Sequence, residues 1–249
     1  MILAWRYLRS LIFVVQMFTV MTLMGIAFLP WAALDRRGAY TGARLFCHYV
    51  RWSVRLICGL RTEIRGPVPR GQVLIAAKHQ SFLDVMLIVS AVPRPKFIMK
   101  DILRFTPIVG FYAARIGCVA VKRGRRAEAI RDMMAGVTSG DAPAGQLIIY
   151  PQGTRVAPGV RADYKVGVAA IYEQTQQPCV PAATNVGLFW PRSGLLRKPG
   201  LAVVEFLPPL PAGLPRETFR ATLEQQIEGA SDALMREGGF DPDGVSRPD

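Results

Sequence analysis

Histidine, cysteine and acidic residues are scarce in this sequence, and each shortage narrows what the protein can do. The chain of 249 residues has two histidines and four cysteines. The cysteines show neither the spacing of metal ligands nor the pairing of a secreted disulfide framework. They are Cys47, Cys58, Cys118 and Cys179. We therefore predict no metal site, and small buried cysteines in a reducing compartment.

The nucleophile elbow of serine hydrolases is also missing, because the sequence contains no G-x-S-x-G. This absence disfavours a serine hydrolase. There is no internal repeat. A chain of 249 residues can hold one α/β domain and an appendage.

The shortage of acidic residues leaves a formal net charge of +13. Residues 94–126 hold nine Lys or Arg against one acidic residue, whereas residues 217–249 hold eight acidic residues against three Arg. Such an excess indicates an anionic partner, for which phosphate, nucleic acid and an acidic membrane surface are candidates. The cations lack interleaved aromatics or a nucleic-acid module, so we predict no nucleic-acid partner.

Charge is absent altogether from residues 10–34. Residues 11–29 would span roughly 28 Å as a helix, close to the thickness of a hydrocarbon core. The alternative, a signal peptide, lacks its short apolar core and small-residue cleavage site. Arginines lie on both sides of the run, at Arg6, Arg9, Arg36, Arg37 and Arg44. This pattern favours a membrane-associating helix or helical hairpin entered from the cytoplasmic side.

A second helix is predicted over residues 36–60, with Arg44, Arg51 and Arg55 on one face. That face could lie on anionic lipid, or the helix could simply pack on the following domain. The pattern leaves both alternatives open.

Strand and helix patterns alternate through the rest of the chain, which predicts an α/β fold with a mixed central sheet flanked by helices. Strands are expected at 61–65, 73–77, 96–99, 118–121, 146–150, 179–184 and 201–206. Helices are expected at 102–115, 126–137, 166–175 and 217–237. We thus expect membrane-associated helices over 1–60, an α/β domain over 61–237, and a disordered tail over 238–249.

The most informative stretch is residues 78–84, between two apolar runs. His79 would follow a buried strand, Ser81 could cap the next helix, and Asp84 would lie in its first turn. Residues five apart in one helix do not meet, so His79 must lie in the turn before the helix to reach Asp84. There the carboxylate would fix the imidazole tautomer and leave a base. Alternatively, Ser81 and Asp84 form a capping box and His79 is a plain loop residue.

Three further strands end in cations, at Lys100, at Lys122-Arg123 and at Arg155. Arg155 closes the sequence Tyr-Pro-Gln-Gly-Thr-Arg (150–155), in which Gly153 would let a ligand approach the backbone. A guanidinium suits a phosphate. If the strands are neighbours, their ends form one positively charged pocket.

Four blocks in this order resemble the motifs of glycerolipid acyltransferases, above all the bacterial 1-acyl-glycerol-3-phosphate acyltransferases that make phosphatidic acid. The blocks are His79-x-x-x-x-Asp84, Gly117 to Arg123, residues 150–155, and Val180-Pro181-Ala182. The resemblance covers residues 79–185 and implies an inner-membrane enzyme whose catalytic domain faces the cytoplasm.

The resemblance also implies roles for single residues. His79 would be the general base and Asp84 its orienting partner. The phosphate of the acceptor, lysophosphatidic acid, would be held by Lys100, Arg123, Gly153, Thr154 and Arg155. Pro181 would line the acyl-donor or core side of the site. The donor would be acyl-CoA or acyl-carrier protein, and no cofactor is expected.

One residue departs from the family pattern, which usually has Glu where this chain has Gln152. The neutral amide puts the acceptor headgroup in doubt more than the reaction. Glycerol-3-phosphate or another lyso-lipid therefore stays an alternative acceptor. A non-catalytic, membrane-bound protein that binds anionic lipid is the remaining alternative.

Overall fold

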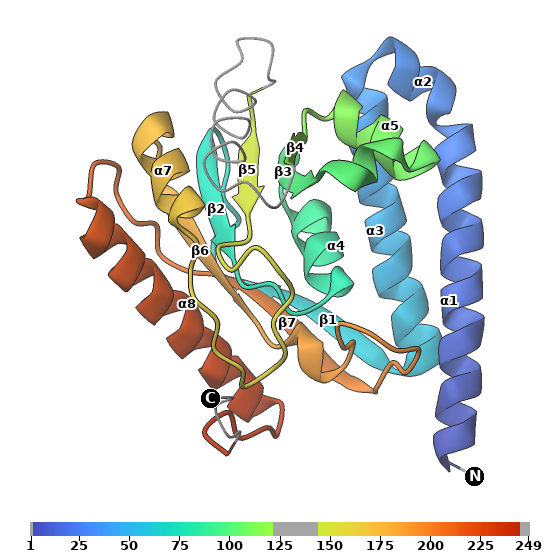
Figure 1. The fold of residues 1–249 in the computed structure, drawn as a ribbon. Helices are drawn as coiled ribbons and strands as arrows, with labels where there is room; N and C mark the ends of the chain where they lie inside the picture. The colour runs from blue at the N-terminus through green and yellow to red at the C-terminus, as the bar shows by residue number, and fades with distance from the viewer. Residues whose placement is uncertain (1, 122–143, 245–249) are drawn as a thin grey trace.

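Seven strands form one sheet between two layers of helices in the computed structural model, which describes residues 2–121 and 144–244 (Figure 1). The strand order across the sheet is β1-β7-β6-β2-β5-β3-β4. The strands are β1 (Leu60–Arg65), β2 (Val73–Ala77), β3 (Pro95–Lys100), β4 (Val119–Val121), β5 (Gln146–Ile149), β6 (Cys179–Thr184) and β7 (Gly200–Phe206). The sequence predicted every one of these to within one residue at each end.

The sheet is mixed, as expected. Strand β2 pairs in parallel with β5 and β6, and β3 pairs in parallel with β5 and β4. Strand β7 runs antiparallel to β6, and β1 is parallel to β7. The carboxyl ends of β2 to β6 therefore lie at one edge, the position where open α/β sheets place their sites.

Successive residues of the central strand β2 face opposite sides of the sheet. Leu74 and Ala76 belong to one apolar cluster, whereas Ile75 and Ala77 belong to another on the opposite face of the sheet. All four are at most 1% exposed. A strand buried on both faces reads as a continuous apolar run, which explains why this one was evident in the sequence.

The helices of the two layers are distinct in Figure 1. One side carries α1 (Ile2–Ala27), α2 (Leu29–Leu34), α3 (Arg36–Cys58), α4 (Phe82–Ala91) and α5 (Pro107–Arg115). The other side carries α7 (Val166–Thr175) and α8 (Arg216–Glu237). Two short 3-10 helices are η1 (Asp101–Phe105) and η2 (Val186–Leu188).

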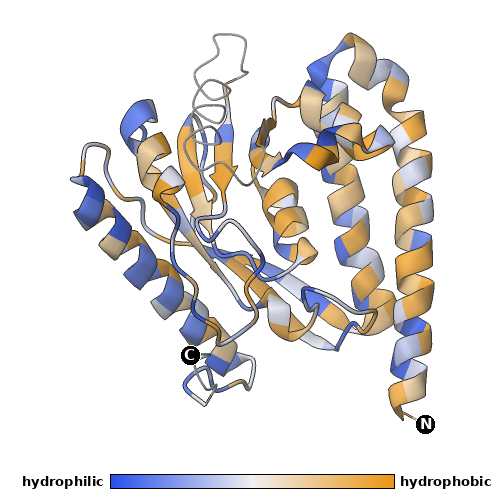
Figure 2. Cartoon of the chain, in the orientation of Figure 1, coloured by the Kyte–Doolittle hydropathy of each residue, from blue (hydrophilic) through white to orange (hydrophobic). Residues whose placement is uncertain are grey.

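Helix α1 packs along α3 and exposes apolar side chains along most of its length (Figure 2). It is long and apolar enough to cross a membrane, judged by length and composition. It is also joined to the α/β part. Phe13 is fully buried and meets Trp190 edge to face at 5.4 Å, and Ser10 Oγ accepts a hydrogen bond from the backbone N–H of Arg197 at 2.9 Å.

Two arginines of α3 are held by hydrogen bonds to the α/β part. Arg44 donates to the carbonyls of Val92 and Pro93, and Arg51 donates to side chains of β1 and α4. The sequence left open whether this helix lies on anionic lipid or packs on the domain. Arg44 and Arg51 pack on the domain. The helix ends at Cys58, two residues earlier than predicted, because Gly59 takes the left-handed conformation (φ 72°) that terminates helices.

One further predicted helix differs from the structure. The helix expected over 102–115 is η1 followed by α5, and the break lies at Thr106. Pro107 explains it, because proline disfavours helical backbone in the preceding residue and itself starts helices well. The helix expected over 126–137 lies outside the described residues. So does the end of the predicted tail, whose residues 238–244 are described.

Candidate active site

His79 and Asp84 form a direct pair between β2 and α4. His79 Nδ1 lies 2.8 Å from Asp84 Oδ1, and the imidazole is 17% exposed while the carboxylate is 1% exposed. The histidine lies in the turn before the helix, as the spacing required. A carboxylate only accepts hydrogen bonds, so Nδ1 carries the proton and Nε2 keeps the lone pair of a base.

The second oxygen of Asp84 completes the helix cap. Oδ2 accepts from the backbone N–H groups of Gln80 (2.9 Å) and Ser81 (2.8 Å). The Ser81 hydroxyl in turn accepts from the N–H of Leu83, which makes a capping box. The two interpretations offered by the sequence therefore hold together: one carboxylate both caps α4 and orients the imidazole.

The imidazole also stacks on an aromatic ring that the sequence had not connected with it. Tyr150 lies parallel to His79 with ring centroids 3.9 Å apart and an angle of 21°. Burial, and then the negative charge of Asp84, raise the pKa of Tyr150 well above its usual value. The phenol of Tyr150 therefore stays neutral, and its ring packs against one face of the His79 imidazole.

The turn over 150–155 begins where β5 ends. Gly153 has φ +68° and donates its N–H to the carbonyl of Tyr150 at 2.8 Å, so the turn uses a backbone conformation that glycine favours. Thr154 is exposed, and Arg155 is half-buried with Nη1 donating to the carbonyl of Arg192 at 2.9 Å. The next residue, Val156, donates its N–H to the His79 carbonyl at 2.8 Å.

The remaining predicted residues lie at different depths. Lys100 is exposed at the carboxyl end of β3, on the same edge as His79. Pro181 is buried inside β6, where it pairs with Ala76 of β2, the strand that leads to His79. Arg123 lies outside the described residues. The structure thus brings His79, Asp84 and the Arg155 turn together.

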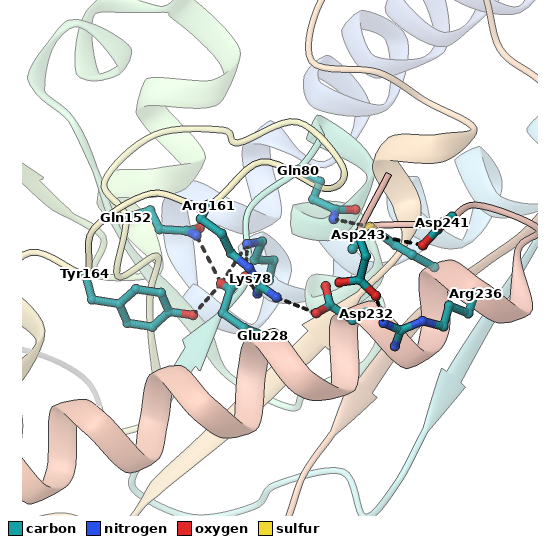
Figure 3. A network of polar contacts seen from close by, with 11 residues as sticks. Lys78, Gln80, Gln152, Arg161, Tyr164, Glu228, Asp232, Arg236, Asp241 and Asp243 are labelled. Atoms are coloured by element: carbon teal, nitrogen blue, oxygen red, sulfur yellow. Dashed lines mark hydrogen bonds and ion pairs between the residues drawn. The ribbon is translucent and has the colours of Figure 1, made fainter. Parts of the chain in front are cut away.

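Sequence reasoning missed a polar network behind the turn, buried except for Arg161 (Figure 3). Its centre is Glu228 of α8, which accepts hydrogen bonds from four side chains. The donors are Lys78 (2.6 Å), Arg161 (2.5 Å), Tyr164 (3.0 Å) and Gln152 (3.2 Å). Arg161 also contacts Asp232. The available signal was the i, i+4 spacing of two carboxylates beside the apolar stripe of this helix.

The fold and the site define an α/β protein with an oriented imidazole and a cationic turn at the edge of a mixed sheet. Residues 60–185, about half of the chain, match the family model described as Acyltransferase, and the chain belongs to that family.

Curated relatives carry more specific names. The chain is 25% identical over 206 residues to a 1-acyl-sn-glycerol-3-phosphate acyltransferase of Pseudomonas aeruginosa, covering 82% of this chain and 80% of that protein. It is 25% identical over 208 residues to the protein of the same name from Saccharomyces cerevisiae, covering 80% and 67%.

A solved structure supports the fold. The 1-acyl-sn-glycerophosphate (LPA) acyltransferase PlsC from Thermotoga maritima superposes with a TM-score of 0.76 at 20% identity. The match covers 92% of this chain and 98% of that one. The likeness extends beyond the family segment and therefore includes helices on both faces of the sheet.

Proposed function

We propose that the protein transfers a fatty acyl group from acyl-CoA or acyl-carrier protein to the free hydroxyl of 1-acyl-glycerol-3-phosphate, giving phosphatidic acid. Membership of the family and the names of its relatives support the reaction. The observation that carries the mechanism is the Nδ1 of His79 held at 2.8 Å by a buried carboxylate. That contact leaves Nε2 as the basic nitrogen.

In this mechanism His79 removes the proton from the acceptor hydroxyl as its oxygen attacks the thioester carbonyl. The C–S bond then breaks, the acyl C–O bond is complete, and the imidazolium returns its proton to the leaving thiolate. Asp84 stabilises the imidazolium and fixes the ring. Because hydroxyl and thioester react directly, no acyl-enzyme is needed, in keeping with the missing serine elbow.

The cations would hold the acceptor by its phosphate. Arg155, which precedes the Val156 contact with His79, offers a planar set of donors, and Lys100 adds a charge at the end of β3, two strands from β2. Gly153, Thr154 and Arg123 complete the proposed phosphate site. Fixing the phosphate positions the hydroxyl, which supplies much of the rate in a reaction between two bound substrates.

We further propose that residues 1–60 hold the enzyme at the cytoplasmic membrane and that residues 61–237 form the catalytic domain on its cytoplasmic side. Exposed apolar residues run along α1, among them Leu11, Val15, Phe18 and Leu23. The ties of Phe13 and Ser10 to the α/β part would keep the site next to the lipid in which the acceptor resides.

The test is acyl transfer by the purified full-length chain in mixed micelles, with lysophosphatidic acid as acceptor and acyl-CoA or acyl-carrier protein as donor. His79→Ala should lower kcat by about 10²- to 10⁴-fold, the usual contribution of a general base. His48→Ala is the matched control, because His48 is the other histidine and lies exposed on α3. Full activity in His79→Ala would refute the mechanism.

An acceptor panel separates the alternatives. Lysophosphatidic acid, glycerol-3-phosphate and a phosphate-free lyso-lipid are compared at equal concentration. A phosphate-free acceptor as best substrate would overturn the proposed phosphate site. Liposome binding without consumption of any thioester would instead indicate a lipid-binding protein that is not an enzyme.

A further inference from the structure

Gln152 lies in the turn over 150–155, and its side chain points away from solvent. It is 2% exposed, and its Nε2 donates to Glu228 Oε1 at 3.2 Å (Figure 3). Its Oε1 is buried and has no hydrogen-bond partner within residues 2–121 and 144–244. The amide therefore faces α8 rather than an open binding surface.

Glu228 joins two parts of the site that are distant in sequence. One of its donors is Lys78, which is 2% exposed and directly precedes the base. Two more, Arg161 and Tyr164, follow the Arg155 turn, and Gln152 lies within that turn. A single carboxylate thus connects the strand end that carries His79 with the segment proposed to bind phosphate.

Two positive and two negative charges meet in this network beside the neutral Gln152. Lys78 and Arg161 supply two positive charges, and Glu228 and Asp232 supply two negative charges. A glutamate at 152 would bring a second carboxylate to within hydrogen-bond distance of Glu228, and one of its oxygens would take the unpartnered position of Oε1. Like charges this close cannot both stay ionised at low cost.

We propose that Glu228 is a positioning residue for the phosphate-binding turn and the base, and that Gln152 is an amide in order to donate to it. This inference rests on the proposed acyl transfer and extends it. On this account Gln152 serves the network around Glu228 of α8 and does not set the acceptor headgroup. Neither residue touches the substrate, so both act through the turn over 150–155.

The experiment compares wild type, Gln152→Glu, Glu228→Gln and the double variant. Each single change should raise KM for lysophosphatidic acid more than it lowers kcat, because the turn that binds phosphate is displaced. The double variant restores one carboxylate facing one amide. Its kcat/KM should exceed the product of the two single effects by at least about threefold, as expected for residues in direct contact. Glu217→Gln, 83% exposed on the same helix, is the matched control.

Two outcomes would overturn the inference: single effects that simply multiply, or a Gln152→Glu enzyme that prefers a different acceptor headgroup. If Glu228→Gln does not fold, Gln152→Glu alone decides. Its melting temperature should lie below that of wild type, because two carboxylates then face each other in a buried site. A melting temperature equal to that of wild type refutes the proposal.

The inference and the proposed function fail in different ways. If wild type does not acylate lysophosphatidic acid, the proposed function is wrong. Thermal unfolding of the same four proteins then still measures the coupling between residues 152 and 228. If wild type is active and the double variant shows no coupling, only the inference is wrong.

Discussion

The backbone N–H of Val156 donates to the carbonyl of His79 at 2.8 Å. This bond joins two motifs that lie some 70 positions apart in the sequence. It sets the proposed phosphate ligand Arg155 one residue away from a direct contact with the proposed base. The bond therefore ties the backbone of the turn to the backbone of the base.

Asp84 and Ser81 share the capping box, but only Asp84 orients the imidazole. Asp84→Asn should lower kcat by about 10²- to 10⁴-fold, because an amide no longer stabilises the imidazolium that forms during transfer. Ser81→Ala removes the cap hydroxyl alone and should lower the free energy of unfolding by about 1 kcal/mol with kcat nearly unchanged. Steady-state kinetics measures kcat of both variants, and denaturant unfolding measures their free energy of unfolding. Equal losses of kcat would mean that the carboxylate serves the helix only.

Arg155 should act on the phosphate of the acceptor. Arg155→Ala should raise KM for lysophosphatidic acid by about 10- to 150-fold, the equivalent of one hydrogen bond to a charged group. The KM for a phosphate-free acceptor should be the same in Arg155→Ala as in wild type. Arg70→Ala is the matched control, because it removes an exposed arginine that precedes the amino end of β2, opposite the end that carries His79. The same loss with both acceptors would place Arg155 outside the phosphate site.

Tyr150 predicts a dependence of stability on alkaline pH. Its pKa is raised from 10.0 by burial and by Asp84, so the folded state keeps a proton that the unfolded state releases. The stabilisation is complete below pH 10 and is lost as the pH rises above it. Tyr150→Phe keeps the ring stacked on His79, so kcat at neutral pH should hold, while stability should fall less steeply above pH 10. Urea unfolding from pH 9 to 11 measures both slopes, and identical slopes would contradict the raised pKa.

Helix α1 offers two phenylalanines with opposite environments. Phe18 is 50% exposed, whereas Phe13 is fully buried against Trp190. Phe18→Ser should weaken liposome binding by about 10- to 150-fold, the equivalent of one phenylalanine leaving an apolar environment, and should leave the melting temperature unchanged. Phe13→Ala should instead cost about 3–5 kcal/mol of stability. Unchanged flotation of Phe18→Ser with liposomes would show that this face does not enter lipid.

The sequence by itself determined the elements and the reactive pair. All seven described strands were predicted, and the central strands β2 and β5 were the plainest, because a strand buried on both faces is a nearly continuous apolar run. The His79–Asp84 contact was also predictable, because both residues lie within one local strand–turn–helix unit. The helix break at Thr106 shows the limit of this approach, because a single proline redirected an otherwise helical pattern.

Tertiary structure alone decided which side chains surround the pair. Lys78 and Glu228 are 150 positions apart, and their contact depends on where α8 crosses the sheet. The stacking of Tyr150 on His79 likewise depends on β5 lying beside β2. Local periodicity states which face of a helix or strand is buried but not which neighbour it meets. That neighbour is fixed by strand order and by the packing of the whole chain.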